Sequence, residues 1–176
     1  MGNSAQPRIV VGVSGSLSSL VALQRAGQEC RLSGRRLLAV LVWRPDGSDT
    51  PPRVGRSALR GTRQGAMCLL RNMLNDVFAA TDDDMPIAGI AIAGSAGQTL
   101  VQVANRDSDV LVIGGGHGGQ LRRWRSPVTH HCLTHAACPV LTVPVSPLQR
   151  ELETLIRRRR LPRMATNVPA PEAHRA

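Results

Sequence analysis

The chain has 176 residues and a formal net charge of +10, and its hydrophobic share of 42% is typical of one globular domain with a buried core. Aromatic residues make up only 2% of the chain, so the core must be aliphatic and rings for base stacking are scarce, which argues against specific nucleic-acid binding. No apolar run approaches the roughly 20 residues that a membrane span requires, so we predict no membrane contact.

The four cysteines show no CxxC pair, and no signal peptide precedes them. We therefore expect Cys30, Cys68, Cys132 and Cys138 to pack as small reduced hydrophobes in a cytoplasmic protein.

The first part of the chain reads as a strand, a helix and a second strand. Residues 8–13 (RIVVGV) are continuously apolar, which is typical of a strand covered on both faces. Ser16 is suited to cap a helix over residues 17–31, and Gly34 ends that helix before an apolar strand at 36–43. The helical spacing predicts an inward face made of Leu17, Leu20, Val21, Ala26 and Cys30.

The middle of the chain continues this alternation. Residues 44–63 are rich in Pro, Gly, Ser and Arg and predict a long loop, and residues 64–80 show helical spacing. The acidic run TDDD at 81–84 is interpreted as a solvated linker rather than a metal site, since no further ligands stand at suitable spacing. A third strand is predicted at 86–93 and a short helix at 98–106.

The stretch from Asp109 to Val145 predicts the last strand–helix–strand unit. Residues 110–113 form a buried strand, a glycine-rich loop follows at 114–119, and Ser126 with Pro127 opens a helix. An apolar strand at 139–145 closes the unit. Five strands alternating with four helices indicate an α/β fold with a parallel sheet between helices.

Beyond this unit the composition changes. Residues 147–176 are predicted to form a basic, partly disordered C-terminal tail, with a short helix at 149–160 and a run of four Arg residues at its end. The tail acts either as a solubilising segment or as a weak contact for polyanions.

Several segments together resemble the universal stress protein family: VVGVSGSLSSLVAL at the first strand, DVLVIG at the fourth, and PVTHHCLTHAACPVLTVPV at the end. The resemblance covers residues 8–146, which we take as the domain. It implies an α/β three-layer sandwich with a five-stranded parallel sheet in the order 3-2-1-4-5, a Rossmann-like fold of the nucleotide-binding α-hydrolase-like type. Strands 1 and 4 would then meet at a topological switch point, where ligands bind.

Members of this family that bind ATP carry G-2x-G-9x-G-(S/T) and an Asp after the first strand. By resemblance, Gly114 is the first glycine, His117 stands at the second, and Ser126 and Pro127 stand at the G-(S/T) pair. Ser14 replaces the Asp. The nucleotide-binding residues that the resemblance implies are Gly12, Val13, Ser14, Val42, Gly114, Gly116, Gly118, Arg122, Ser126, Val128 and Thr129.

The departures from the family motif argue against binding of ATP at this site. Pro127 has no N–H, and a Ser126 hydroxyl that capped its own helix would occupy the amide of Val128 or Thr129. Ser14 lacks the negative charge of the Asp that it replaces. In the other direction, a glycine-rich loop can present amides to phosphate, and Arg122 with its neighbouring arginines can either reach a polyphosphate or remain solvated.

Two functions therefore stay open: an ATP-binding stress-response module, and a nucleotide-free interaction protein with the same fold. The resemblance implies a homodimer through the last strand, Val140 to Val145, and regulatory protein partners that the sequence does not identify. His131 and His135 stand four apart on a helix but lack further ligands, so no metal site is predicted. No nucleophile and base pair stands out, so we predict no catalytic residues and no enzyme.

Overall fold

The computed structural model describes residues 6–45, 62–79, 85–115 and 126–144, together with Ser146 and Glu151. The chain divides into two compact units, residues 1–145 and residues 146–176, and all five strands belong to the first. The residues outside the described ranges include most of the predicted 44–63 loop, the predicted 81–84 linker, Gly116, Gly118 and Arg122, and nearly all of the predicted tail.

A five-stranded sheet forms the centre of the first unit. Its strands are β1 (Arg8–Val13), β2 (Arg36–Trp43), β3 (Ile87–Ala93), β4 (Val110–Gly114) and β5 (Val140–Val143). Every neighbouring pair is parallel, and the order is β3-β2-β1-β4-β5. This confirms the predicted fold class, and it places β1 beside β4 at the point where the strand order reverses.

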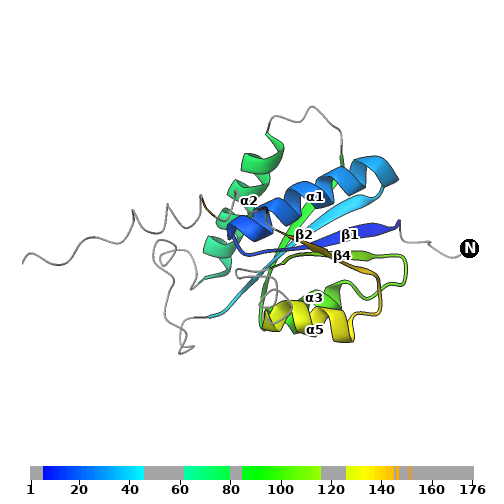
Figure 1. Ribbon diagram of the computed structural model, residues 1–176. Helices are drawn as coiled ribbons and strands as arrows, with labels where there is room; N and C mark the ends of the chain where they lie inside the picture. The colour runs from blue at the N-terminus through cyan, green and yellow to red at the C-terminus, as the bar shows by residue number, and fades with distance from the viewer. Residues whose placement is uncertain are drawn as a thin grey trace, which may run out of the picture. The chain divides into compact units, whose positions relative to one another are not determined.

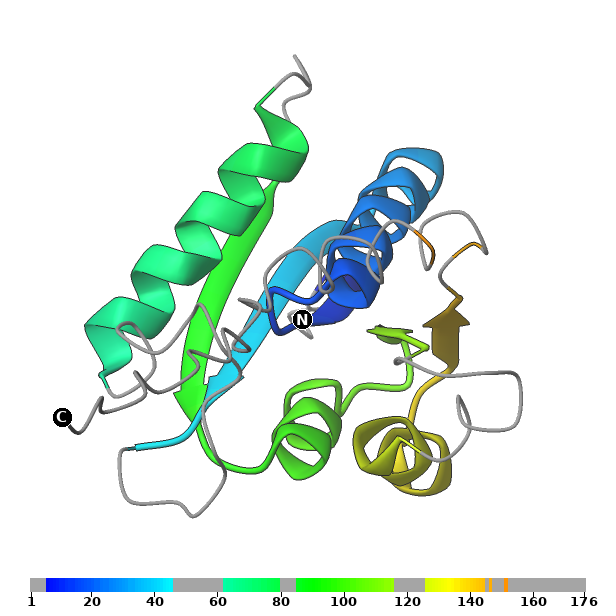
Figure 2. The ribbon, with the colours of Figure 1, turned by 60° about the vertical axis from the view of Figure 1, so that its left-hand side comes forward.

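In the described segments, two helices cover each face of the sheet. Figures 1 and 2 show α1 (Leu17–Ser33) and α2 (Arg63–Phe78) on one face, and α3 (Ala96–Val103) and α5 (Pro127–His135) side by side on the other. Helix α1 begins at Ser16, whose hydroxyl accepts from the Ser19 amide, and ends at Gly34, which takes the left-handed conformation with a φ of 66°. The predicted caps of this helix are confirmed.

The two faces of the sheet bury separate apolar cores. Along β1, Ile9, Val11 and Val13 belong to the core under α1 and α2, whereas Val10 belongs to the core under α3 and α5. Side chains of a strand alternate between the two faces, so a strand that is covered on both sides must be apolar throughout. The continuous apolar runs of the sequence are explained by this arrangement.

A buried ion pair joins β1 to the start of β4 at the amino end of the sheet. The Arg8 guanidinium donates twice to the Asp109 carboxylate, from Nη2 to Oδ2 at 2.6 Å and from Nε to Oδ1 at 3.1 Å. Its Nη2 also donates to the Val103 carbonyl oxygen at 3.1 Å. The Asp109 side chain is fully buried, so Arg8 is the partner that makes this charge tolerable inside the fold.

The first turn of α1 buries two serines that its apolar spacing does not place on the inward face. Leu17, Leu20 and Val21 are only half-buried, whereas Ser18 and Ser19 are buried. The first turn of α1 packs against the end of β4, and small serine side chains fit there more closely than leucine does. Ala26 and Cys30 are buried as predicted, and the half-buried Leu20 and Val21 pack against the core under α1 and α2, so the prediction was wrong only for Leu17, which belongs to neither core.

Three further expectations need correction. Helix α3 begins at Ala96, two residues before the predicted start, and ends at Val103, three residues before the predicted end. Strand β5 ends at Val143 rather than at 145. Cys68 lies exposed on α2, whereas Cys30, Cys132 and Cys138 are buried as predicted.

Candidate functional site

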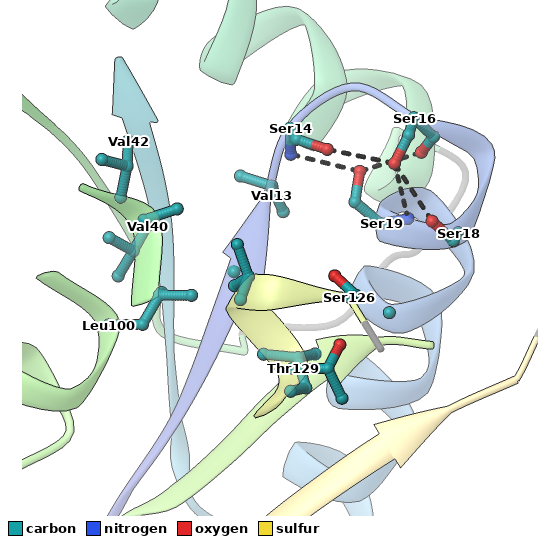
Figure 3. Close-up of a pocket in the computed structure, with 15 residues that line it drawn as sticks. Val13, Ser14, Ser16, Ser18, Ser19, Val40, Val42, Leu100, Ser126 and Thr129 are labelled. Atoms are coloured by element: carbon teal, nitrogen blue, oxygen red, sulfur yellow. Dashed lines mark hydrogen bonds between the residues drawn. The ribbon is translucent and has the colours of Figure 1, made fainter. Parts of the chain in front are cut away.

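A cavity of about 290 Å³ opens at the carboxyl ends of β1 and β4 (Figure 3). This is the switch point of the sheet, where the connections of the two strands leave toward opposite faces and make room for a ligand. Strands β1, β2 and β4 and the first turns of α1, α3 and α5 supply its lining: Gly12, Val13, Ser14, Ser16, Ser18, Ser19, Val40, Val42, Ala96, Leu100, Ile113, Gly114, Ser126, Val128 and Thr129.

The structure brings together the predicted site residues that it describes. Those that line the cavity are Gly12, Val13, Ser14, Val42, Gly114, Ser126, Val128 and Thr129. The other predicted residues, Gly116, Gly118 and Arg122, lie outside the described residues, so their part in the site stays a prediction.

Sequence reasoning missed three groups of lining residues. Val40 and Ile113 could have been found from strand periodicity, because Val40 lies two residues before Val42 and so shares its face of the sheet. Ser16, Ser18 and Ser19 could have been suspected only once the first turn of α1 was known to face the cavity. Ala96 and Leu100 come from α3, and no signal in the sequence links that helix to the site.

One side of the cavity is aliphatic. Figure 3 shows Val40 and Val42 of β2 beside Leu100 of α3, and we call these three residues the aliphatic wall. Leu100 packs directly on β1, since a Cβ atom at Gly12 would stand 2.8 Å from its Cδ1 atom. Glycine at this position therefore allows α3 to lie close to the sheet. The wall offers a dry surface to a flat apolar group such as a nucleobase.

The opposite side carries hydroxyl groups. We call Ser14, Ser16, Ser18 and Ser19 the serine cluster; Gly15, with a φ of 69°, makes the turn that folds them together. The Ser16 hydroxyl oxygen lies 3.0 Å from that of Ser14 and 3.1 Å from that of Ser18, and it also accepts from the Ser19 amide at 3.3 Å.

A second link fixes the turn itself. The Ser19 hydroxyl accepts from the Ser14 amide at 3.2 Å and donates to the Ser16 carbonyl oxygen at 2.8 Å. The serine cluster is thus a connected network of small neutral groups. A hydroxyl can donate as well as accept, whereas a carboxylate at position 14 could only accept.

The amino end of α5 differs from its prediction. Ser126 occupies the N-cap position, but its hydroxyl makes no capping hydrogen bond. Pro127 has no amide hydrogen, and the His130 amide bonds to the Ser126 carbonyl oxygen, so the amides of Val128 and Thr129 are left without a partner inside the helix. The predicted helix start at Ser126 and Pro127 is confirmed, but the Ser126 hydroxyl does not occupy a donor of its own helix, and unpaired amides at a helix N-terminus can bind an anion.

Gly114 is the residue at which β4 and α1 come closest. A Cβ atom there would stand 2.5 Å from the Ser18 carbonyl oxygen and 2.7 Å from its carbonyl carbon. These are backbone atoms, so they cannot turn aside as the end of a side chain can. Gly114 therefore has a packing role, whether or not its amide also contacts a ligand.

The described lining of the cavity contains no charged residue. Within the described ranges, no group of three or more His, Cys, Asp or Glu residues is placed to hold a metal ion. His131 and His135 stack with their ring centroids 4.2 Å apart, but neither lines the cavity, and Cys132 is buried on another face of α5.

The buried thiols are poor nucleophiles. Burial raises the pKa of Cys30 and of Cys132 to about 11, so both stay protonated at neutral pH. Burial also raises the pKa of Cys138. None of the three lines the cavity. The absence of enzymatic activity stays a prediction.

Among the helices of the described segments, none is long and apolar enough to cross a membrane.

Comparison with known proteins matches residues 7–144 to the Universal stress protein family. A universal stress protein whose crystal structure is in complex with cAMP is 24% identical, with a TM-score of 0.59 over 81% of this chain and 100% of that chain. UspA from Lactobacillus plantarum is 20% identical, with a TM-score of 0.60 over 80% and 99% of the two chains.

A universal stress protein family member from Burkholderia pseudomallei is 21% identical, with a TM-score of 0.57 over 82% of this chain and 100% of that chain. A search of curated proteins finds no match. At these identities the structures support the fold, and the family match covers the whole of the sheet and its helices.

Proposed function

Since this chain belongs to the universal stress protein family, we propose that it is a stress-response module that binds ATP or a related adenine nucleotide in the cavity between β1 and β4. The observation that carries this proposal is the convergence of β1, β2, β4 and three helix ends on one cavity at the switch point. A structural relative solved in complex with cAMP is in agreement with a nucleotide of this kind.

The cavity has two sides that match the two ends of a nucleotide. The aliphatic wall suits the flat face of an adenine ring, because transfer of this apolar surface from water to a contact with Val42 and Leu100 is favourable. The serine cluster and the amino end of α5 suit the sugar and phosphate, because hydroxyls and unpaired helix amides replace the water around them.

The module acts in the cytoplasm by binding rather than by catalysis. Nucleotide occupancy would change the surface offered to regulatory protein partners. Hydrolysis needs a positioned base or metal, and the hydroxyl groups of the described lining are weak bases at neutral pH. The rival function is a nucleotide-free interaction protein with the same fold, and the titration below distinguishes the two.

We expect calorimetry to detect ATP binding by the purified chain at physiological salt, and Val42→Glu to weaken that binding by at least tenfold, about 1.4 kcal/mol. Val42 is half-buried in the aliphatic wall, where a carboxylate would repel phosphate and hydrate the surface meant for the base. Leu133→Glu is the matched control, because Leu133 lies exposed on α5 outside the cavity. A wild-type chain that gives no heat up to millimolar ATP, AMP and cAMP would leave only the nucleotide-free function.

We also propose a homodimer through the last strand, Val140 to Val145. Within the described sheet, β5 pairs only with β4. The carbonyl oxygens of Pro139 and Val143 accept from β4, so by alternation the amides of Val140 and Thr142 point to the open edge. A second copy can satisfy those amides.

Thr142→Pro is therefore expected to convert the dimer into a monomer while leaving the β4–β5 ladder intact, because proline removes the outward amide. Light scattering on purified protein measures the change, and Thr142→Val, which keeps the amide, should remain dimeric. A wild-type chain that is already monomeric at high micromolar concentration would contradict the proposal.

A further inference from the structure

Helices α3 and α5 supply two parts of the cavity lining. They lie side by side on one face of the sheet (Figure 2), and the first turns of both reach the cavity. Ala96 and Leu100 line it from α3, and Val128 and Thr129 line it from α5; Figure 3 shows Leu100 and Thr129 in this lining. The spacing between the two helices therefore sets one dimension of the space that a ligand can occupy.

A glycine stands where the two helices are closest. Gly97 is buried in the first turn of α3, between two lining residues, but it does not itself line the cavity. A Cβ atom at Gly97 would stand 2.9 Å from the Cβ atom of His131 on α5, and 3.0 Å from the Cγ and Cδ2 atoms of the same side chain. Rotation of a side chain does not move its Cβ atom, so a methyl group at Gly97 would push α3 and α5 apart.

Helix formation does not account for this glycine. Glycine is a poor residue inside a helix, and alanine is favoured there by propensity alone. A second contact confirms the close approach, because the Cys132 thiol donates to the Gly97 carbonyl oxygen at 4.0 Å and both residues are buried. The close packing of α5 on α3 is therefore what requires a residue without a side chain at Gly97.

We propose that Gly97 determines which bases the cavity accepts. By letting α3 lie close to α5, it keeps the lining around Leu100 and Thr129 narrow, so that an unsubstituted adenine fits and a base with an added ring or halogen does not. Gly97 acts through Leu100 and is a positioning residue, because it does not line the cavity itself. This inference rests on the proposed binding of an adenine nucleotide, and it names what limits the size of the base.

Calorimetric titration of the full chain compares nucleotides that differ only in the base. ATP, AMP and cAMP are each titrated beside their N6-benzyl and 8-bromo derivatives, which enlarge opposite edges of the adenine ring. We expect the wild type to bind the plain nucleotide at least tenfold more tightly than one or both of its enlarged derivatives. The comparison is made on the same phosphate group, so it applies to whichever of the three nucleotides binds.

Gly97→Ala adds one methyl group at the contact. We expect this variant to fold, because the gain in helix propensity offsets part of the overpacking, and to prefer the plain base by less than threefold. The double variant Gly97→Ala with His131→Gly removes the atoms that the methyl group meets and should restore the tenfold preference. Gln98→Ala is the matched control, since Gln98 is the next residue of α3 and is exposed outside the cavity.

The ratio between plain and enlarged bases separates this role from a purely structural one, which would weaken the binding of all the nucleotides equally. The inference is wrong if the wild type binds both kinds of base alike, or if Gly97→Ala fails to fold, keeps the wild-type preference or loses affinity for all compounds equally. It is also wrong if the double variant does not restore the preference, or if Gln98→Ala abolishes it. A wild type that binds none of ATP, AMP and cAMP at millimolar concentration would instead refute the proposed function, and the inference with it.

Discussion

Replacing Arg8 by alanine is expected to lower the free energy of unfolding by about 3–5 kcal/mol. The substitution leaves the fully buried Asp109 carboxylate without its two charge-assisted hydrogen bonds, and a charge that is buried without a partner is strongly destabilising. It also removes the bond to the Val103 carbonyl oxygen, which holds the end of α3. Urea denaturation, followed by circular dichroism at pH 7, measures the difference.

Arg36 provides the matched control. It stands opposite Arg8 in the register of β1 and β2, but its side chain is exposed, so Arg36→Ala should cost less than about 0.5 kcal/mol. The double variant Arg8→Met with Asp109→Leu should recover much of the lost stability, since it removes both charges and fills their place. Equal stabilities for Arg8→Ala and Arg36→Ala would show that the ion pair contributes nothing.

The second large effect is expected at Gly114. Gly114→Ala should destabilise the fold by about 3 kcal/mol, at the upper end of the usual cost of overpacking, because the new methyl group meets the Ser18 backbone at 2.5 Å. Relief requires the first turn of α1 to move away from β4, and this movement displaces the serine cluster from the cavity. Thermal denaturation measures the stability, and nucleotide titration below the transition should show weakened binding.

Gly89→Ala is the control that tests whether a methyl group added elsewhere in the sheet destabilises the fold as much as Gly114→Ala does. Gly89 lies in β3, and its Cβ atom would meet the side-chain ends of Leu70 and Leu74 at 3.0 and 3.1 Å. Those ends can rotate, and alanine is less costly than glycine within a strand, so the change should stay below about 1 kcal/mol. A Gly114→Ala variant as stable as Gly89→Ala would mean that α1 adjusts freely at this contact.

The strands were predictable because each one contains a continuous or nearly continuous apolar run. Side chains such as Val10 and Val11 point to opposite faces of the sheet, and both faces are covered, so hydrophobicity alone marks the segment. The order of the strands was not contained in these patterns. It came from the resemblance to a known family, and the structure confirms it.

The helices were harder to predict at the site. The apolar spacing of α1 predicts an inward Leu17, but the contact of this turn with Gly114 accompanies buried Ser18 and Ser19, and Leu17 belongs to neither core. Likewise, Ser126 before Pro127 is a strong helix start in any sequence, yet its hydroxyl does not cap the helix. Both outcomes depend on what lies across the cavity, and short-range patterns carry no information about that.

The sequence by itself determined the α/β class of this protein, because apolar runs and the turns between them are local properties, and the resemblance to a known family implied the site residues at the ends of β1 and β4. Only the tertiary structure decided which groups face one another: the aliphatic wall of β2 and α3 lies opposite the serine cluster. These contacts join segments that are far apart along the chain, and their positions follow from the packing of the whole sheet between its helices.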